Sequence, residues 1–129
     1  MIAYAATASG TFSIELETGE VTSAEPFERP PEPILNLPRL VAAAATGATV
    51  VALVDAKPPL LVSHDAGTTW LESGRGLPPG SAVAIAETDP DTIVYAARNR
   101  VYVSLDGGVF WTAVTGELPE IEAVAVSDV

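Results

Sequence analysis

The chain alternates between short apolar runs and turn-forming residues. The runs are rich in Val, Ile, Thr, Tyr and Ala, and they are separated by Gly, Pro and Asp. Such runs predict β-strands, because β-branched and aromatic side chains fit the half-buried surface of a sheet. Gly, Pro and Asp at the boundaries predict tight turns between the strands. The pattern therefore predicts an all-β fold.

The apolar runs recur with a period of about forty residues. The clearest pair is "VSHDAGTTW" at Val62–Trp70 and "VSLDGGVFW" at Val103–Trp111, and the two segments begin 41 residues apart. Ahead of them, "TVVALVD" at Thr49–Asp55 matches "TIVYAAR" at Thr92–Arg98. A fixed period of this length predicts that each repeat forms one structural unit.

Each full repeat is predicted to contain four strands, named A to D in chain order. Strands A to D span 40–45, 49–54, 60–63 and 69–72 in one repeat, and 82–86, 92–97, 101–104 and 110–114 in the next. The chain opens with strands B, C and D at 2–7, 11–16 and 20–24, and it ends with a lone strand A at 122–127. The order BCD, ABCD, ABCD, A predicts three four-stranded sheets.

The two repeated segments resemble the Asp-box or BNR repeat, Ser-x-Asp-x-Gly-x-x-Trp, of β-propellers such as sialidases, sortilin-type receptors and photosystem II assembly factors. The matching residues are Ser63, Asp65, Gly67 and Trp70 in one box and Ser104, Asp106, Gly108 and Trp111 in the other. The first repeat keeps only Ser13, Glu15 and Gly19 of the pattern and has no Trp. The resemblance implies that each sheet is a propeller blade, with the boxes on the outer rim, away from the binding face.

The box residues are interpreted as structural. An Asp at the end of strand C can accept backbone N–H bonds across the turn, and the Gly supplies a positive φ. The Trp that follows can bury a large area between blades. A hydrolytic Ser63–His64–Asp65 triad is the alternative, but the other box has Leu105 at the position of His64.

Three blades are too few to surround an axis, because propellers have roughly four to eight. The termini would also leave open strand edges. We therefore expect two chains to exchange strands and to close a six-bladed β-propeller as a homodimer of about 27 kDa, twice the 13.3 kDa of one chain. The expected blades are 1–27 completed by 121–127 of the partner, 39–73 and 80–115, with a linker at 25–39. An open-ended fragment, or a partner for a larger chain, is the alternative.

The basic residues gather on one predicted face. Antiparallel order places the D-to-A and B-to-C connections on the same face, and loops on a rigid scaffold often carry binding residues. All six basic residues fall in these connections, although acidic residues share the face and loops collect charges in any case. The predicted ligand-binding residues are Arg29, Arg39, Lys57, Arg75, Arg98 and Arg100. The linker holds five of the eleven prolines and is either a spacer or a recognition segment.

The amino-acid composition argues against several classes of binding partner and cofactor. A formal charge of -11 argues against nucleic acid and anionic membranes, which require a basic surface. With no Cys and with His64 as the single His, neither a disulfide framework nor a zinc site is expected, and no cofactor is predicted. The N-terminus does not look like a signal peptide, and no apolar run is long enough for a membrane span. We expect a cytoplasmic protein.

The sequence favours a non-catalytic binding or scaffolding protein that uses the D-to-A and B-to-C loop face. Its partners would be a second copy of itself and a protein or carbohydrate ligand. A glycosidase-like hydrolase or a sugar-binding lectin is the alternative, although no sialidase-type arrangement of Arg, Tyr and acidic residues is recognised. Tyr4 and Tyr95 are interpreted as equivalent core positions of strand B.

Overall fold

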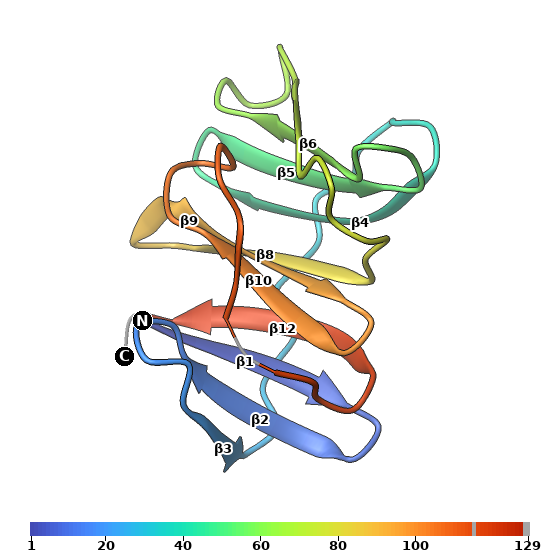
Figure 1. The fold of residues 1–129 in the computed structure, drawn as a ribbon. Helices are drawn as coiled ribbons and strands as arrows, with labels where there is room; N and C mark the ends of the chain where they lie inside the picture. Colours follow the sequence, from blue (N-terminus) through green and yellow to red (C-terminus); the bar gives the residue numbers. More distant parts are fainter. Residues whose placement is uncertain (115, 128–129) are drawn as a thin grey trace.

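The structure, a computed structural model, describes residues 1–114 and 116–127. Residue 115, the last of the expected third blade, and residues 128–129 lie outside this description. The described residues form twelve strands and no helix (Figure 1). The strands are β1 (Ile2–Thr7), β2 (Gly10–Glu15), β3 (Val21–Ala24), β4 (Leu40–Thr46), β5 (Thr49–Val54), β6 (Leu60–Ser63), β7 (Leu71–Ser73), β8 (Ala82–Ala86), β9 (Asp89–Ala97), β10 (Arg100–Ser104), β11 (Thr112–Ala113) and β12 (Ile121–Ser127).

The strands form three four-stranded antiparallel sheets, which confirms the all-β class and the predicted number of sheets. Blade 1 has the order β12-β1-β2-β3, blade 2 has β4-β5-β6-β7, and blade 3 has β8-β9-β10-β11 from one edge to the other. The outermost strands β7 and β11 begin later than the sequence predicts. The reason is that the backbone N–H groups of Thr69 and Phe110 bond to the box aspartates and so belong to the turns.

Blade 3 lies in the middle of the stack. Its first strand, β8, packs against β4 of blade 2 on one side and against β12 of blade 1 on the other, and Figure 1 shows the three sheets one above another. The spatial order is therefore blade 2, blade 3, blade 1. The linker leaves β3 at one end of the stack and reaches β4 at the other (Figure 1).

Two apolar clusters hold the sheets together. One lies between blades 2 and 3 and includes Val51, Leu53 and Tyr95. The other lies between blades 3 and 1 and includes Val94 and Ile121. Burial of each large aliphatic side chain stabilises the fold by about 1.5–3 kcal/mol. The alanines of β4, β8 and β12 let these three strands approach closely where the sheets pack against one another.

The predicted strand exchange is not found, and this expectation is corrected. Strand β12 pairs with β1 of its own chain, with Ala5 opposite Val124 and Ile2 opposite Ser127. Pairing within one chain closes a loop but avoids the loss of translational and rotational freedom that association costs. Blade 1 is thus complete without a partner. Association of two chains into a larger ring stays a prediction.

The outward face of blade 1 is more polar than the faces inside the stack. In blade 3 the paired Val94 and Val103 are buried against blade 1. The strand register gives Tyr4 and Ser13 the corresponding places on blade 1, and both are half-exposed. The Ser13 hydroxyl is hydrogen-bonded to the Thr22 hydroxyl at 2.7 Å. This face therefore suits solvent better than it suits another tightly packed sheet.

Tyr4 and Tyr95 are not equivalent, which corrects the interpretation from the sequence. Tyr95 pairs with Val83, whereas Ala5 is the residue that pairs with the corresponding Val124. A shift of one residue along a strand moves a side chain to the opposite face of the sheet. Tyr95 is consequently buried between blades, while Tyr4 faces outward and contacts the ring of Phe27 in the linker, with centroids 6.1 Å apart.

A designed disulfide tests which chain supplies β12. Tyr4 and Ala125 are paired and half-exposed, and directly opposite residues in antiparallel strands lie roughly 4.5–5.5 Å apart, within reach of a disulfide. Because the chain has no Cys, the variant Tyr4→Cys/Ala125→Cys should oxidise to a single species that runs near 13.3 kDa on a non-reducing gel. Tyr4→Cys alone is the control. A covalent band at twice that mass in the double variant would restore strand exchange.

Candidate functional site

The two predicted Asp boxes form nearly the same turn. In the first, the Ser63 hydroxyl donates to Asp65 Oδ1 at 2.7 Å, and the same Oδ1 accepts the Thr69 N–H at 2.8 Å. In the second, the Ser104 hydroxyl donates to Asp106 Oδ1 at 2.8 Å, which also accepts the Phe110 N–H at 3.0 Å. The carboxylate thus replaces strand pairing for the residues that lead into β7 and β11.

The serines and glycines complete these turns. The N–H of Gly67 donates to Ser63 Oγ at 2.8 Å, and the N–H of Gly108 donates to Ser104 Oγ at 2.9 Å. The φ angles of these two glycines are +87° and +98°, a region that side-chain-bearing residues rarely adopt. A Cβ on Gly108 would also lie 3.0 Å from Ser73 Oγ. Glycine at this position therefore lets blade 3 approach blade 2.

Hydrogen bonds to the turns lower the pKa of both box aspartates. The pKa of Asp65 falls to about 2, mainly through the Thr69 hydroxyl, with the Thr69 N–H and the Ser63 hydroxyl adding to it. The pKa of Asp106 is lowered chiefly by the Phe110 N–H and then by the Ser104 hydroxyl. Both carboxylates thus accept hydrogen bonds from residues of their own turns.

The two box tryptophans have different surroundings. The Trp111 indole N–H donates to Ser73 Oγ on blade 2 at 3.0 Å, and the ring meets Tyr95 edge-on at 6.1 Å. The Ser73 hydroxyl in turn donates to the Gly108 carbonyl. Trp70 belongs to blade 2, which ends the stack, and it is half-buried beside its own turn at Gly67. Of the two, it is Trp111 that joins neighbouring blades.

Tyr95 is held between the blades by its hydroxyl. This hydroxyl donates to the Pro78 carbonyl at 2.6 Å. Burial raises the pKa of Tyr95 to about 12, and the neighbouring Tyr102 adds to the shift. The phenol therefore stays protonated and acts as a hydrogen-bond donor to the connection that leads into β8.

The structure brings two of the six predicted basic residues into one hollow. Lys57, from the β5–β6 connection, and Arg75, from the β7–β8 connection, line a cavity of about 430 Å³. Its other walls are Pro58, Pro59, Gly76, Leu77, Pro78 and Pro79. We call this cavity the proline hollow. It lies on the predicted loop face, where the D-to-A and B-to-C connections meet.

The local backbone presents Arg75 to solvent. Gly74 and Gly76 have φ angles of +83° and +84°, and the Leu77 N–H closes the turn on the Gly74 carbonyl at 3.0 Å. The Arg75 side chain is 84% exposed, and a loose ion pair of 3.8 Å joins it to Glu72. Exposed pairs of this kind contribute about 0–1 kcal/mol, so Glu72 can exchange for another anion.

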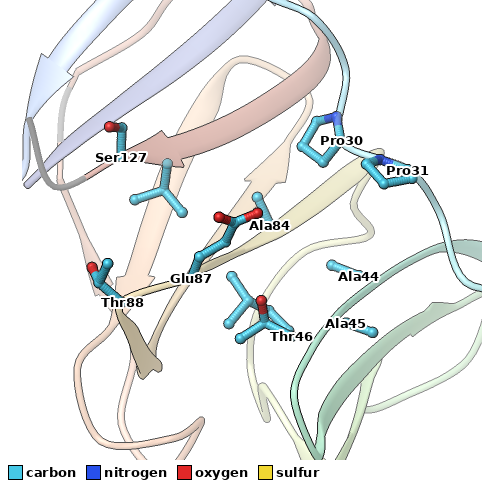
Figure 2. Close-up of a pocket in the computed structure, with 11 residues that line it drawn as sticks. Pro30, Pro31, Ala44, Ala45, Thr46, Ala84, Glu87, Thr88 and Ser127 are labelled. Carbon is cyan, nitrogen blue, oxygen red and sulfur yellow. The ribbon is translucent and has the colours of Figure 1, made fainter.

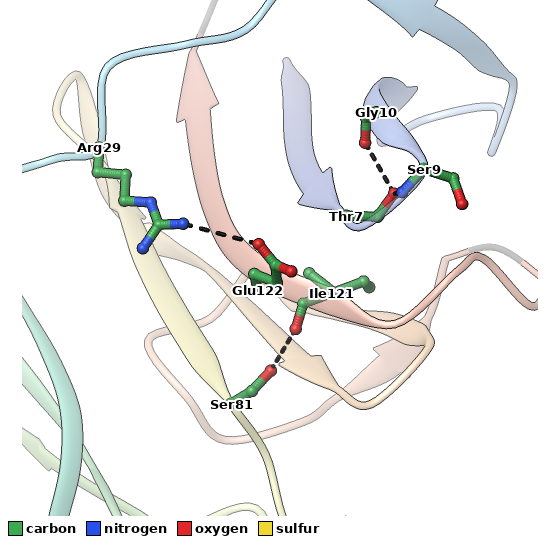
Figure 3. A network of polar contacts seen from close by, with 7 residues as sticks. All are labelled: Thr7, Ser9, Gly10, Arg29, Ser81, Ile121 and Glu122. Carbon is green, nitrogen blue, oxygen red and sulfur yellow. Dashed lines mark hydrogen bonds and ion pairs between the residues drawn. The ribbon is translucent and has the colours of Figure 1, made fainter.

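The remaining four basic residues do not join this hollow. Arg29 pairs with Glu122 of β12 at 3.9 Å (Figure 3). Arg98 lines a separate cavity of about 460 Å³ with Asn99, Leu118 and Glu120, and its carbonyl accepts the N–H of Ile121. Arg39 and Arg100 line none of the cavities described here.

The linker lines two small hollows beside β4, β8 and β12. Pro30 and Pro31 face Ala44 and Ala45 of β4 across a hollow of about 180 Å³ (Figure 2). A second hollow of about 230 Å³ lies beside Arg29 and Glu32. The Glu32 carboxylate accepts the Ala43 N–H at 2.8 Å and so attaches the linker to the edge of β4. Both hollows fall below the roughly 300–1,000 Å³ usual for ligand sites.

A larger cavity was not predicted from the sequence. It holds about 660 Å³ between β7 and the turn of the second box, and we call it the rim hollow. Its exposed apolar walls are Leu71, Val109 and Phe110. One sequence difference could have indicated this cavity. Thr68-Thr69 of the first box is replaced by the apolar pair Val109-Phe110 in the second. Apolar residues at these turn positions are expected to be exposed.

The described residues provide neither a metal cluster nor a membrane-spanning helix. Among residues 1–114 and 116–127, no three His, Asp or Glu side chains are grouped so that they could hold a metal ion. Over the same residues, the structure contains no helix that could span a membrane. The cytoplasmic location stays a prediction.

Comparison with known proteins places the chain in no family. No family model matches the sequence, and no curated protein matches it. A crystal structure of a GH74 enzyme from Niastella koreensis is similar, with a TM-score of 0.49 and 22% sequence identity. The match covers 85% of this chain and 17% of that protein, so the chain spans only a small part of its length.

Neutralising a box aspartate should reduce stability in a pH-dependent way. Because the pKa of Asp65 is lower in the folded state, its contribution is present above the ordinary aspartate pKa of 3.8 and is lost as the pH falls toward about 2. We expect Asp65→Asn to lower the melting temperature at pH 7 and to flatten its decrease between about pH 4 and pH 2. Asp55→Asn removes an exposed charge outside the boxes and serves as the control. Equal melting curves for both variants would contradict the proposed role of the carboxylate.

Removal of the Ser73 hydroxyl should weaken the contact between blades 2 and 3. Ser73→Ala leaves the Trp111 N–H without its partner. The loss of a hydrogen bond at such a site costs about 1–3 kcal/mol. Urea unfolding followed by Trp fluorescence measures this difference, with the exposed Ser9→Ala as control. Unchanged stability would mean that this hydrogen bond does not hold the blades together.

Proposed function

We propose that this chain is a non-catalytic binding module that holds an anionic ligand in the proline hollow. The observation that carries the proposal is the convergence of Lys57 and Arg75, from two different loops, on one cavity of the predicted loop face. The two cations belong to a chain with a formal charge of -11. A protein with a large net negative charge does not attract anions in general. Two cations that line one cavity would therefore bind an anion through local contacts at that cavity.

The chemistry of the walls defines the ligand class. Four prolines and Leu77 provide an apolar surface, and the two basic residues line the same cavity. A volume of about 430 Å³ is within the range of small-molecule and side-chain sites. A carboxylate or phosphate attached to an apolar body would use both features, because charge-assisted hydrogen bonds orient the anion while its body displaces water.

The state of other groups favours binding over catalysis. Both carboxylate oxygens of Asp65, and Oδ1 of Asp106, accept hydrogen bonds within their turns. The hydroxyl of Tyr95 is bonded to a backbone carbonyl. Groups whose hydrogen-bonding capacity is already used for folding are poor candidates for acid–base or nucleophilic work on a ligand.

Two related small molecules test the proposal. N-acetylphenylalanine combines a carboxylate with an apolar ring, and its amide has the same body without the charge. In ¹H–¹⁵N NMR titrations we expect the acid to shift the amide signals of Gly76 and Leu77 and the amide to shift them far less. Lys57→Gln/Arg75→Gln should weaken binding of the acid roughly tenfold, as expected for the loss of charge-assisted contacts.

The control variant is Arg100→Gln, which removes a cation from the same face but outside the hollow. It should bind the acid as the unmodified chain does. Equal binding of the acid and the amide, or no effect of the Lys57→Gln/Arg75→Gln substitutions, would contradict the proposed function.

A further inference from the structure

The proline hollow and the rim hollow meet at one short turn. Arg75, Gly76 and Leu77 line both cavities. The two cavities are therefore adjacent and share this turn as a wall. A single extended ligand that passes over the turn would contact both cavities.

The rim hollow carries an unusual share of the exposed apolar surface. Leu71 is 66% exposed, Val109 69% and Phe110 75%. Six large hydrophobic side chains are exposed among residues 1–114 and 116–127, and these three line the same cavity. Single exposed apolar residues are normal, but clusters of them mark interaction surfaces.

The floor of the rim hollow is preformed. Trp111, Ser73 and the Gly108 carbonyl are joined by two successive hydrogen bonds that cross from blade 3 to blade 2. Gly108 packs so closely that an added Cβ would lie 3.1 Å from Val62. A cavity whose floor is already fixed binds an apolar side chain without the cost of ordering that floor.

Charge and strand order indicate the chemistry of the occupant. Arg75 lines both cavities, and its exposed side chain forms a loose pair with Glu72, so an acidic group of a ligand can replace Glu72 there. Strand β7, which forms one wall, is the outermost strand of blade 2. The open edge of a sheet accepts an extended peptide, whose alternate side chains then point to the same face.

We propose that the partner is an extended peptide segment with an apolar residue, an acidic residue and a second apolar residue at alternate positions. The acidic residue binds Arg75, one apolar side chain enters the rim hollow and the other enters the proline hollow. This inference rests on the proposed function, which assigns Arg75 and the proline hollow to an anionic ligand. It adds the rim hollow and the peptide nature of the partner.

The test uses a synthetic peptide, acetyl-Phe-Ser-Asp-Ser-Leu-amide, and the full chain. We expect NMR titration to shift the amide signals of Gly107–Trp111 together with those of Gly74–Leu77. Phe110→Ser should weaken binding about fivefold or more, as truncation of a central apolar contact does. The Phe110 side chain is exposed, and its backbone N–H to Asp106 is retained in the variant, so the fold should persist.

Leu105→Ser is the matched control, because Leu105 is 68% exposed in the same turn region but does not line the rim hollow. It should leave binding of the peptide unchanged. A second peptide with Ser in place of Phe should bind the unmodified chain as weakly as the original peptide binds Phe110→Ser. A third peptide with Asn in place of Asp should lose binding to the same degree as Arg75→Gln does.

Failure of this inference can be distinguished from failure of the proposed function. If the peptide shifts only residues of the proline hollow, and Phe110→Ser binds it normally, the rim hollow is not part of the site. The same conclusion follows if N-acetylphenylalanine binds but the peptide does not. If neither ligand binds, the proposed function itself is wrong.

Discussion

Six residue pairs between β12 and β1 join the end of the chain to its beginning. Strand β12 gives blade 1 its inner strand, and it also packs against β8 of the middle blade. Ile121 and Val124 of this strand lie in the cluster that binds blade 1 to blade 3. Ala3, Ala5 and Ile14 of β1 and β2 lie in the same cluster, so β12 completes an interface that the other strands of blade 1 also form. The packing of blade 1 on the middle blade therefore depends on this strand, whereas blade 2 packs on the middle blade without it.

Much of the fold could be predicted because the repeats use the same short-range chemistry. Val, Ile and Ala runs with Gly and Asp turns identified all twelve strands and their order within each sheet. The origin of the strand beside β1 could not be predicted in this way, because its pattern fits β1 of the same chain and of a second copy equally well. The predicted equivalence of Tyr4 and Tyr95 was wrong for a related reason. "IAYAAT" and "IVYAAR" align well as text, but β1 is displaced by one residue relative to that alignment.

The candidate site was predictable only in part. The turn pattern placed Lys57 and Arg75 in connections on one face, but their shared cavity depends on how the β5–β6 and β7–β8 loops fold toward each other. Gly74 and Gly76 shape the β7–β8 loop through their positive φ angles. A pattern of apolar and polar residues does not predict these angles. The rim hollow arises from the contact between two blades, so no single repeat contains it. Ser73 and Trp111, which form its floor, are 38 residues apart in sequence.

The spatial order of the blades has a consequence for biosynthesis. Strands β1, β2 and β3 are made well before β12, the inner strand of their sheet, and the sheet they must pack against is made in between. Until blade 3 and β12 have been made, the apolar side of β1 has no surface to cover it. Exposed strand edges of this kind invite pairing with other nascent chains. The linker lies between this incomplete sheet and blade 2, whose four strands are consecutive in the sequence and need no later strand to complete their sheet.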